Sequence, residues 1–225
     1  MSFLLAIEGG DGAGKATAAA EVAAQLNAGG RSAAVLSFPR YAETLGGHVL
    51  GEYLGGRLPR AASPRSAAVL YALDRMESAD AIGDAAGAHE VVVFDRYIAS
   101  NMAYQAAQVP ASQAEALMRW IARLELEQFA LPAPTLSIYL DTPVEAAREL
   151  IFRKRKRSYT DDALDAYEAD VALQHRVRAN YAAMAKEGLL GRWATVPTIA
   201  DGALRPPAAI AAAIIAAMDG AIGGG

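Results

Sequence analysis

The chain has 225 residues, a formal net charge of −4 and no cysteine. This length accommodates one α/β domain with a full core, and the lack of cysteine excludes disulfides and thiolate metal sites. The mildly acidic balance gives no sign of nucleic-acid binding, so any anion site must be local. No apolar run reaches the roughly 18 residues needed to span a bilayer. We therefore expect a cytoplasmic protein that binds neither nucleic acid nor membranes.

Short apolar runs alternate with helix-like segments along the chain. Strands are predicted at residues 3–8, 32–38, 91–95, 135–141 and 192–197. Helices are predicted at residues 15–28, 45–56, 64–86, from about 97, 111–129, 165–187 and 206–218. Continuous apolar strands separated by helices are typical of a parallel sheet covered on both faces. The predicted fold is α/β with a five-stranded parallel sheet flanked by helices, in which residues 1–222 form one domain and 223–225 a flexible tail.

A glycine-rich loop of sequence GGDGAGK, residues 9–15, lies between the first predicted strand and the first helix. Glycines let the backbone wrap so that successive N–H groups point at phosphate oxygens, and the following helix begins with its positive end there. Lys15 adds a cation for the β- and γ-phosphates. A P-loop at 9–16 of a three-layer P-loop NTPase fold is therefore predicted, binding ATP through Gly10, Asp11, Gly12, Ala13, Gly14, Lys15, Ala16 and Thr17.

Magnesium binding is less straightforward, because Ala16 stands where P-loops usually carry Ser or Thr. The hydroxyl that helps to hold Mg²⁺ is missing. Thr17 comes one position late and, on a helix, would point about 100° away. We expect phosphate oxygens, water and a carboxylate to hold the ion, with Asp11 as the nearest candidate.

Four further segments narrow the choice among kinases, GTPases and ATPases. In chain order they are FPRY at 38–41, YALDR at 71–75, DRY at 95–97 followed by Ser100, Asn101 and Tyr104, and a basic run at 153–157 followed by DAYE at 165–168. In this order and spacing they resemble thymidylate kinases, particularly those of actinobacteria. The resemblance implies transfer of the ATP γ-phosphoryl group to dTMP, giving dTDP and ADP, by an enzyme that is typically a homodimer.

The FPRY segment ends the second predicted strand, so it falls at the carboxyl edge of the sheet, where ligands bind in open α/β folds. By resemblance, Phe38 and Pro39 border the thymine, and Arg40 and Tyr41 lie near the acceptor phosphate. Taken alone, the segment fits a strand-terminating turn with a surface arginine equally well.

Tyr71 and Arg75 are four residues apart and share a helix face, with Asp74 beside them. The resemblance implies that Tyr71 stacks on the pyrimidine and that Arg75 bonds its carbonyl oxygen. Many family members have Phe at the stacking position, and Tyr71 should still stack. An ordinary core tyrosine with a solvated arginine is the alternative.

Asp95 ends a buried strand, where the resemblance implies a second carboxylate that orders Mg²⁺ or its waters. Arg96 would grip the acceptor phosphate, because its fork of donors matches the phosphate oxygens. An Asp–Arg pair that caps the next helix is the structural alternative. Tyr97, Asn101 and Tyr104 share one helix stripe. The resemblance places Asn101 near the base and phosphate, and Tyr104 against C2′ of the sugar, where it excludes ribose.

The basic run at 153–157 would usually be a solvated helix face. Thymidylate kinases carry a mobile lid in this region that closes on ATP, which here implies a lid at about 153–165. A lid arginine, Arg153 or Arg157, can stabilise charge on the transferring oxygens, since the P-loop offers only Ala13 where one branch of the family has arginine. Asp162 and its neighbour Asp161 occupy a place where actinobacterial relatives tend to keep a phosphate-binding arginine.

Asp165 and Glu168 share a helix face downstream of the lid and, with Tyr167, resemble a segment that faces the substrate and a Mg²⁺ site. Asp11, Asp95 and Glu168 are thus the predicted metal ligands. The predicted catalytic residues are Lys15, Arg96, Asp11, Arg153 and Arg157.

No general base is required, because the acceptor phosphate is already an anion and catalysis is positioning plus charge neutralisation. Two alternatives stay open: a kinase for another pyrimidine nucleotide or deoxynucleoside, and a catalytically weak nucleotide-binding regulator, which Ala16 and the lid changes would favour. A GTPase switch is disfavoured because the chain contains no Asn-Lys-x-Asp motif.

Overall fold

The computed structural model describes residues 2–155 and 171–223. At its centre lies a five-stranded sheet in the order β2-β3-β1-β4-β5, and every neighbouring pair of strands is parallel. The strands are β1 Phe3–Glu8, β2 Ala33–Ser37, β3 Val91–Asp95, β4 Leu136–Asp141 and β5 Trp193–Pro197. The α/β fold with five parallel strands, predicted from the sequence, is confirmed.

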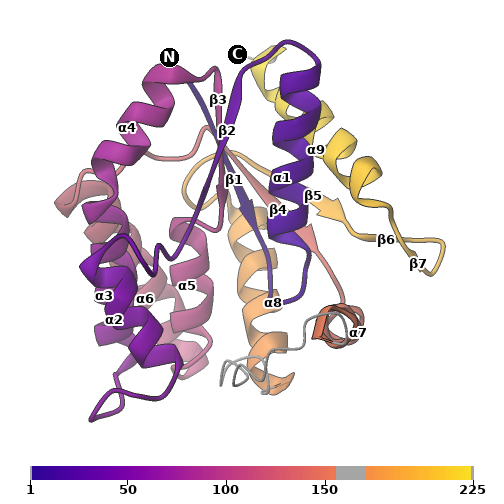
Figure 1. Ribbon diagram of the computed structural model, residues 1–225. Coiled ribbons are helices and arrows are strands. Elements are labelled where there is room, and N and C mark those ends of the chain that lie inside the picture. Colours follow the sequence, from indigo (N-terminus) through magenta and orange to yellow (C-terminus); the bar gives the residue numbers. More distant parts are fainter. Residues whose placement is uncertain (1, 156–170, 224–225) are drawn as a thin grey trace.

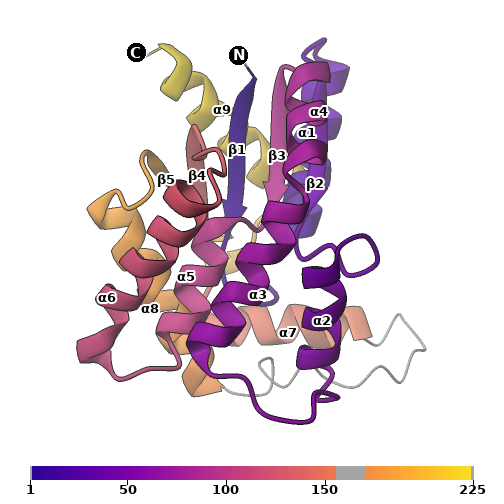
Figure 2. The ribbon, with the colours of Figure 1, turned by 90° about the vertical axis from the view of Figure 1, so that its left-hand side faces the viewer.

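Helices cover both faces of this sheet (Figure 1). They are α1 Lys15–Ala28, α2 Leu45–Leu54, α3 Pro64–Glu77, α4 Ala79–Ala88, α5 Ile98–Ala106, α6 Ala111–Arg123, α7 Val144–Arg155, α8 Val171–Glu187 and α9 Pro207–Gly223. The buried side chains of α1 and α9 meet one face, whereas those of α4, α5 and α8 meet the other. Figure 2 shows that α2, α3, α5, α7 and α8 extend beyond the carboxyl ends of the strands, opposite the two chain termini.

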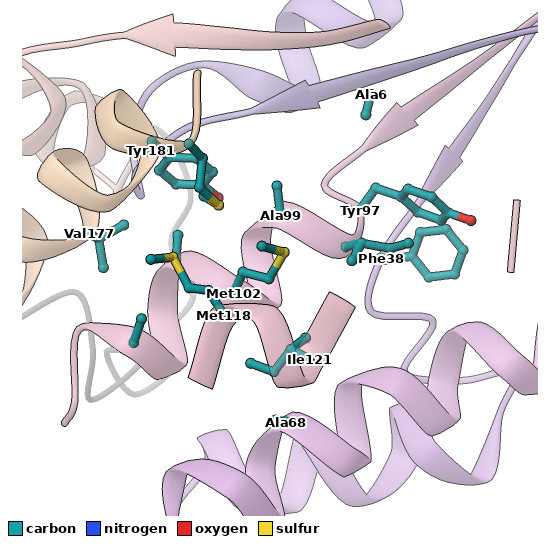
Figure 3. Packing of buried hydrophobic residues seen from close by; sticks show 14 of the residues in the cluster. Ala6, Phe38, Ala68, Tyr97, Ala99, Met102, Met118, Ile121, Val177 and Tyr181 are labelled. Carbon is teal, nitrogen blue, oxygen red and sulfur yellow. The ribbon is translucent and has the colours of Figure 1, made fainter. Parts of the chain in front are cut away.

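The two cores follow from the alternation of side chains along each strand. In β1, Leu5 and Ile7 face the α1–α9 side, whereas Ala6 faces the other side. Figure 3 shows the second core, where side chains of α5, α6 and α8 meet, among them Met102 and Tyr181. Because apolar groups are buried on both faces, the strands read as continuous apolar runs in the sequence.

Two predicted helices are interrupted in the structure. The helix predicted at 64–86 breaks at Ser78, whose hydroxyl donates to the Asp74 carbonyl at 2.8 Å and competes with the helical bonding pattern. The helix predicted at 111–129 is α-helical only to Arg123 and continues as a π-helix, η1, over Leu124–Gln128. Such π turns are rare and are often found at functional sites.

The C-terminal region also departs from the prediction. A short hairpin, β6 Ile199–Ala200 and β7 Ala203–Leu204, follows β5. Its turn residues Asp201 and Gly202 both have positive φ, 50° and 74°, as the Asp-Gly turn of a two-residue hairpin requires. Helix α9 runs on to Gly223, the first residue of the predicted tail. In the described ranges, no helix is long and apolar enough to cross a membrane.

Candidate functional site

The glycine-rich loop joins the carboxyl end of β1 to the first residue of α1, Lys15. Gly12 and Gly14 have φ of 75° and 87°, a left-handed conformation that favours glycine. The Lys15 ammonium is buried and donates to the carbonyl of Gly10 at 2.6 Å. The loop therefore has the strand–loop–helix context that phosphate binding needs.

Burial shapes the charge of Lys15. Desolvation, reinforced by the Arg96 cation, lowers the pKa of its ammonium to about 7, against the opposing pull of Asp11 and Asp95. The positive charge at this position is thus costly in the free protein. A bound phosphate would raise the pKa of Lys15 again and so favour the charged ammonium.

Asp11, at the centre of the loop, is held by side chains from two distant elements. The guanidinium of Arg96 donates to its carboxylate, and the amide of Gln174, in α8, donates to the other carboxylate oxygen at 2.9 Å. The backbone N–H of Asp11 in turn donates to the side-chain oxygen Oε1 of Gln174 at 3.3 Å. Burial alone would raise the pKa of Asp11, but the charges of Arg96 and Lys15 lower it.

Arg96 follows directly after β3 and has a φ of 66°, which is unusual for a residue with a side chain. Its N–H donates to the carbonyl of Ile7 at 3.1 Å, which fixes this strained conformation at the sheet edge. Its guanidinium lies 5.5 Å from the centre of the Tyr104 ring. Strained backbone that is held in this way clusters at functional sites.

A pocket opens beside Arg96 at the carboxyl edge of the sheet. It is lined by Asp11, Pro39, Tyr41, Leu54, Tyr71, Arg96, Ser100, Asn101, Tyr104 and Gln105. The structure thus brings together five residues that the sequence assigned to the substrate in addition to Arg96: Pro39, Tyr41, Tyr71, Asn101 and Tyr104. Leu54, Ser100 and Gln105 were not predicted. Helices α2, α3 and α5 supply most of the lining.

Three predicted substrate residues of the described part of the chain lie outside this lining. Phe38, joined to Pro39 by a cis peptide, is buried with its ring 6.2 Å from that of Phe94. Arg40 forms an ion pair with exposed Glu43.

The third, Arg75, is itself buried rather than solvated. Its Nε and Nη2 donate to the two carboxylate oxygens of Glu125, in η1, at 2.5 and 2.6 Å. Its guanidinium lies 6.0 Å from the centre of the Phe38 ring. The solvated-arginine alternative is therefore wrong for this residue.

A buried carboxylate, Glu8, lies at the end of β1 directly before the loop. It accepts hydrogen bonds from the Tyr97 N–H at 2.9 Å, the Ser100 hydroxyl at 2.6 Å and the Tyr181 hydroxyl at 3.2 Å. Burial raises the pKa of Glu8, although these donors oppose the shift. Glu8 thereby ties the loop to α5 and to α8.

The predicted metal and lid residues are only partly described. Arg157, Asp165, Tyr167 and Glu168 lie outside the described residues, and only the backbone of Arg153, in the last turn of α7, belongs to them. Across residues 2–155 and 171–223, no three His, Asp or Glu side chains gather as a metal site. The predicted set of Asp11, Asp95 and Glu168 therefore stays a prediction.

Known proteins share both the sequence pattern and the fold. A family model described as thymidylate kinase matches residues 7–198. The thymidylate kinase of Mycobacterium tuberculosis is 39% identical over 202 residues, covering 88% of this chain and 93% of the relative. That of Leifsonia xyli subsp. xyli is 35% identical over 224 residues, covering 98% and 96%. A thymidylate kinase structure from Candida albicans has the same fold, with a TM-score of 0.71 and 21% identity over 97% of this chain and 92% of that one.

The chain belongs to the thymidylate kinase family. It is therefore a nucleoside-monophosphate kinase, a phosphotransferase that converts dTMP into dTDP. The resemblance to actinobacterial thymidylate kinases is confirmed by the Mycobacterium and Leifsonia relatives.

Three polar residues of this thymidylate kinase site gave no signal in the sequence: Glu8, Glu125 and Gln174. Each lies in a segment that reads as ordinary strand or helix, and each finds its partner far along the chain. Gln174 and Asp11, for example, are 163 residues apart. A buried acidic residue that ends a strand, as Glu8 does, is the one pattern that could have been noticed, because lone carboxylates are rarely buried without partners.

Proposed function

We propose that phosphoryl transfer takes place at Arg96, where the glycine-rich loop and the pocket meet. The loop would hold the phosphates of ATP, and the pocket would hold dTMP. The observation that carries this assignment is the position of Arg96, which contacts Asp11 of the loop and also lines the pocket. An arginine there can release Asp11 and offer its donors to the acceptor phosphate.

The chemistry asks little of the protein beyond positioning and charge neutralisation. The 5′-phosphate of dTMP is already a nucleophile, so no proton has to be removed from it. Lys15 would recover its positive charge against the ATP phosphates and stabilise the negative charge that spreads over the transferring oxygens. Arg96 would hold the acceptor phosphate in line.

The base and sugar would lie between α3 and α5. Tyr71 would stack on the pyrimidine, and Asn101 would accept a hydrogen bond from its N3–H. The side-chain amide oxygen of Asn101 suits this role, since it is buried and has no hydrogen-bond partner among the described residues. Half-buried Tyr104, whose ring lies against Arg96, would exclude a 2′-hydroxyl.

Magnesium, when bound, would neutralise negative charge on the phosphates, and Asp11, Asp95 and Glu168 are the residues proposed to hold it. The two predicted carboxylates in the described part differ in how they could contribute. Asp11 is already engaged by Arg96 and Gln174. Asp95, at the end of β3, lies close enough to raise the pKa of Lys15, and its side chain forms no hydrogen bond within residues 2–155 and 171–223. If Asp95 and Glu168 hold the ion, Asp95→Asn and Glu168→Gln should each raise the Mg²⁺ concentration needed for half-maximal activity. An unchanged Mg²⁺ concentration at half-maximal activity would exclude them as ligands.

The lid at about 153–165, the single domain at 1–222, a homodimeric state and a cytoplasmic location are further parts of this proposal. The lid assignment is supported by α7, which packs directly on the loop: a Cβ added to Gly12 would lie 2.4 Å from the Ala147 carbonyl oxygen. We expect Arg153 or Arg157 of this lid to act on the phosphates.

A coupled assay of ADP release tests the proposal. With ATP as donor, we expect the highest kcat/KM for dTMP, followed by dUMP, with dCMP and UMP far lower. Activity that is equal across the four nucleotides would contradict the pocket assignment. Binding of ATP and dTMP without turnover would instead favour a catalytically weak nucleotide-binding regulator. None of the comparisons supports that alternative.

A further inference from the structure

The π-helix η1 brings one carboxylate, Glu125, into the protein interior. Glu125 is fully buried, whereas its neighbour Glu127 in the same turn is exposed. The extra residue per turn in a π-helix changes which side chains face inward. The π-helix places Glu125 in contact with α3 and α5, the two helices that flank the pocket.

Glu125 binds two side chains at once. Its carboxylate receives both Nε and Nη2 of Arg75, and the oxygen that accepts from Nη2 also accepts from Nδ2 of Asn101 at 2.9 Å. The bidentate pair fixes the plane of the Arg75 guanidinium and leaves the N–H groups of Nη1 for another acceptor.

The same carboxylate fixes which way the Asn101 amide points. Its nitrogen lies between two acceptors, the Glu125 carboxylate and the Ala68 carbonyl oxygen, each at 2.9 Å. Turning the amide over would set its oxygen against both acceptors, which repel it. The amide oxygen is therefore the atom left for a ligand, and no described residue donates to it.

We propose that Glu125 is a positioning residue that selects thymine over cytosine. It does so by fixing the side-chain oxygen of Asn101 as an acceptor in the pocket lining, while Arg75, outside that lining, holds the Glu125 carboxylate in place. The inference rests on the proposed placement of the base in this pocket, and Glu125 itself would not touch the nucleotide.

The chemistry of the two bases supports this selection. Thymine offers a donor at N3–H, which complements the side-chain oxygen of Asn101 in the pocket lining. Cytosine has the opposite pattern, with an acceptor at N3 and a donor at its 4-amino group. In the fixed pocket, cytosine would therefore place its N3 acceptor against the acceptor oxygen of Asn101. Mismatched buried polar groups discriminate more strongly than shape does.

A merely structural role explains the arrangement less well. A buried ion pair contributes little stability relative to an apolar pair of the same volume. An apolar pair, however, would leave the Asn101 amide free to turn over. The bond to Asn101, which a simple pair with Arg75 does not need, is what links Glu125 to base choice.

The test compares Glu125→Gln with Glu127→Gln, which makes the same chemical change on the exposed side of the same turn. For each, kcat/KM is measured with dTMP and with dCMP. We expect Glu125→Gln to lower the dTMP-to-dCMP ratio by about tenfold or more, and Glu127→Gln to leave it within about twofold. A purely structural role would lower both values in proportion and leave the ratio unchanged, which would overturn the inference.

Glu125→Asp covers the case in which the glutamine variant does not fold. It keeps a charge for Arg75 but is one methylene shorter, so it cannot reach Arg75 and Asn101 together. We expect a folded protein, checked by circular dichroism, with a lowered dTMP-to-dCMP ratio; an unchanged ratio again overturns the inference. If the wild-type enzyme itself shows no preference for dTMP over dCMP, the proposed pocket fails, rather than the role of Glu125 alone.

Discussion

The phosphate loop and the nucleoside pocket meet at Asp11 and Arg96, but they are built in different ways. In the proposed site, the loop would offer the phosphates consecutive backbone N–H groups at 9–16 and one lysine. The pocket takes most of its groups from α2, α3 and α5, and a buried carboxylate in η1 orients one of them, Asn101. A loop made of backbone can hold any nucleoside triphosphate, whereas selecting a base requires oriented side chains. The predictions below separate these two kinds of construction.

The largest effect is expected at the junction. Arg96→Ala removes the fork of donors for the acceptor phosphate, so kcat should fall by about 10³-fold or more, while the Kd of ATP changes only a few-fold. Steady-state kinetics and calorimetry measure both. Arg119→Ala, which removes an exposed arginine paired with Glu115, is the matched control and should stay within about twofold. A similar loss in both variants would contradict a role for Arg96 at the junction.

The second prediction concerns packing of the loop against α7. Gly12 and Gly14 both have positive φ, so alanine strains the backbone at either position. A Cβ on Gly12 would lie 2.4 Å from the Ala147 carbonyl oxygen, whereas a Cβ on Gly14 meets nothing within 4 Å. Gly12→Ala should therefore lower the free energy of unfolding by about 1–3 kcal/mol more than Gly14→Ala. Equal losses in chemical denaturation would show that α7 does not press on the loop.

The third prediction concerns the protonation of Lys15. Its pKa of about 7 means that the ammonium is largely neutral in the free protein above that pH. ATP phosphates favour the charged form, so binding takes up a proton when the pH exceeds 7, and affinity falls as the pH rises. Between pH 8 and 9.5 the Kd of ATP should weaken by up to about tenfold per pH unit. Calorimetry in buffers of different ionisation enthalpy measures the proton uptake.

Lys15→Met tests whether the proton taken up on ATP binding goes to Lys15. The variant should bind ATP more weakly and without the pH dependence, because methionine cannot titrate. Proton uptake that persists in Lys15→Met would assign the titration to another group.

The smallest effect is expected in the network that joins the loop to α8. Tyr181→Phe removes a hydroxyl that donates to Glu8 and lies 2.8 Å from the Ser100 hydroxyl. The free energy of unfolding should fall by about 1–2 kcal/mol, with kcat and the base preference nearly unchanged. A large loss of kcat in a stably folded variant would show that Glu8 has a more direct part in catalysis.

The same difference in construction decides what the sequence could predict. The five strands, the loop and the pocket residues Tyr71, Asn101 and Tyr104 follow from local patterns or from short motifs that resemble a family. The misjudged boundaries are local conflicts: the hydroxyl of Ser78 ends α3 early, and the Asp-Gly signal for the hairpin at 199–204 was present but not used.

The buried polar partners were beyond prediction from one sequence. Arg75 and Glu125 are 50 residues apart, and Glu8 and Ser100 are 92 apart. No periodicity links such pairs, because their contact depends on how helices pack over the sheet. For this reason the burial of Arg75 against Glu125 was not predicted.

Base selection by the pocket alone is tested most directly by measuring dTMP and dCMP binding, without ATP, to Lys15→Met and Asn101→Ala. The loop variant should keep the wild-type ratio of the two Kd values, although it no longer transfers phosphate. Asn101→Ala should lower that ratio by about tenfold or more, with the Kd of ATP unchanged. Loss of the preference in Lys15→Met, or its survival in Asn101→Ala, would contradict the separation of the two regions.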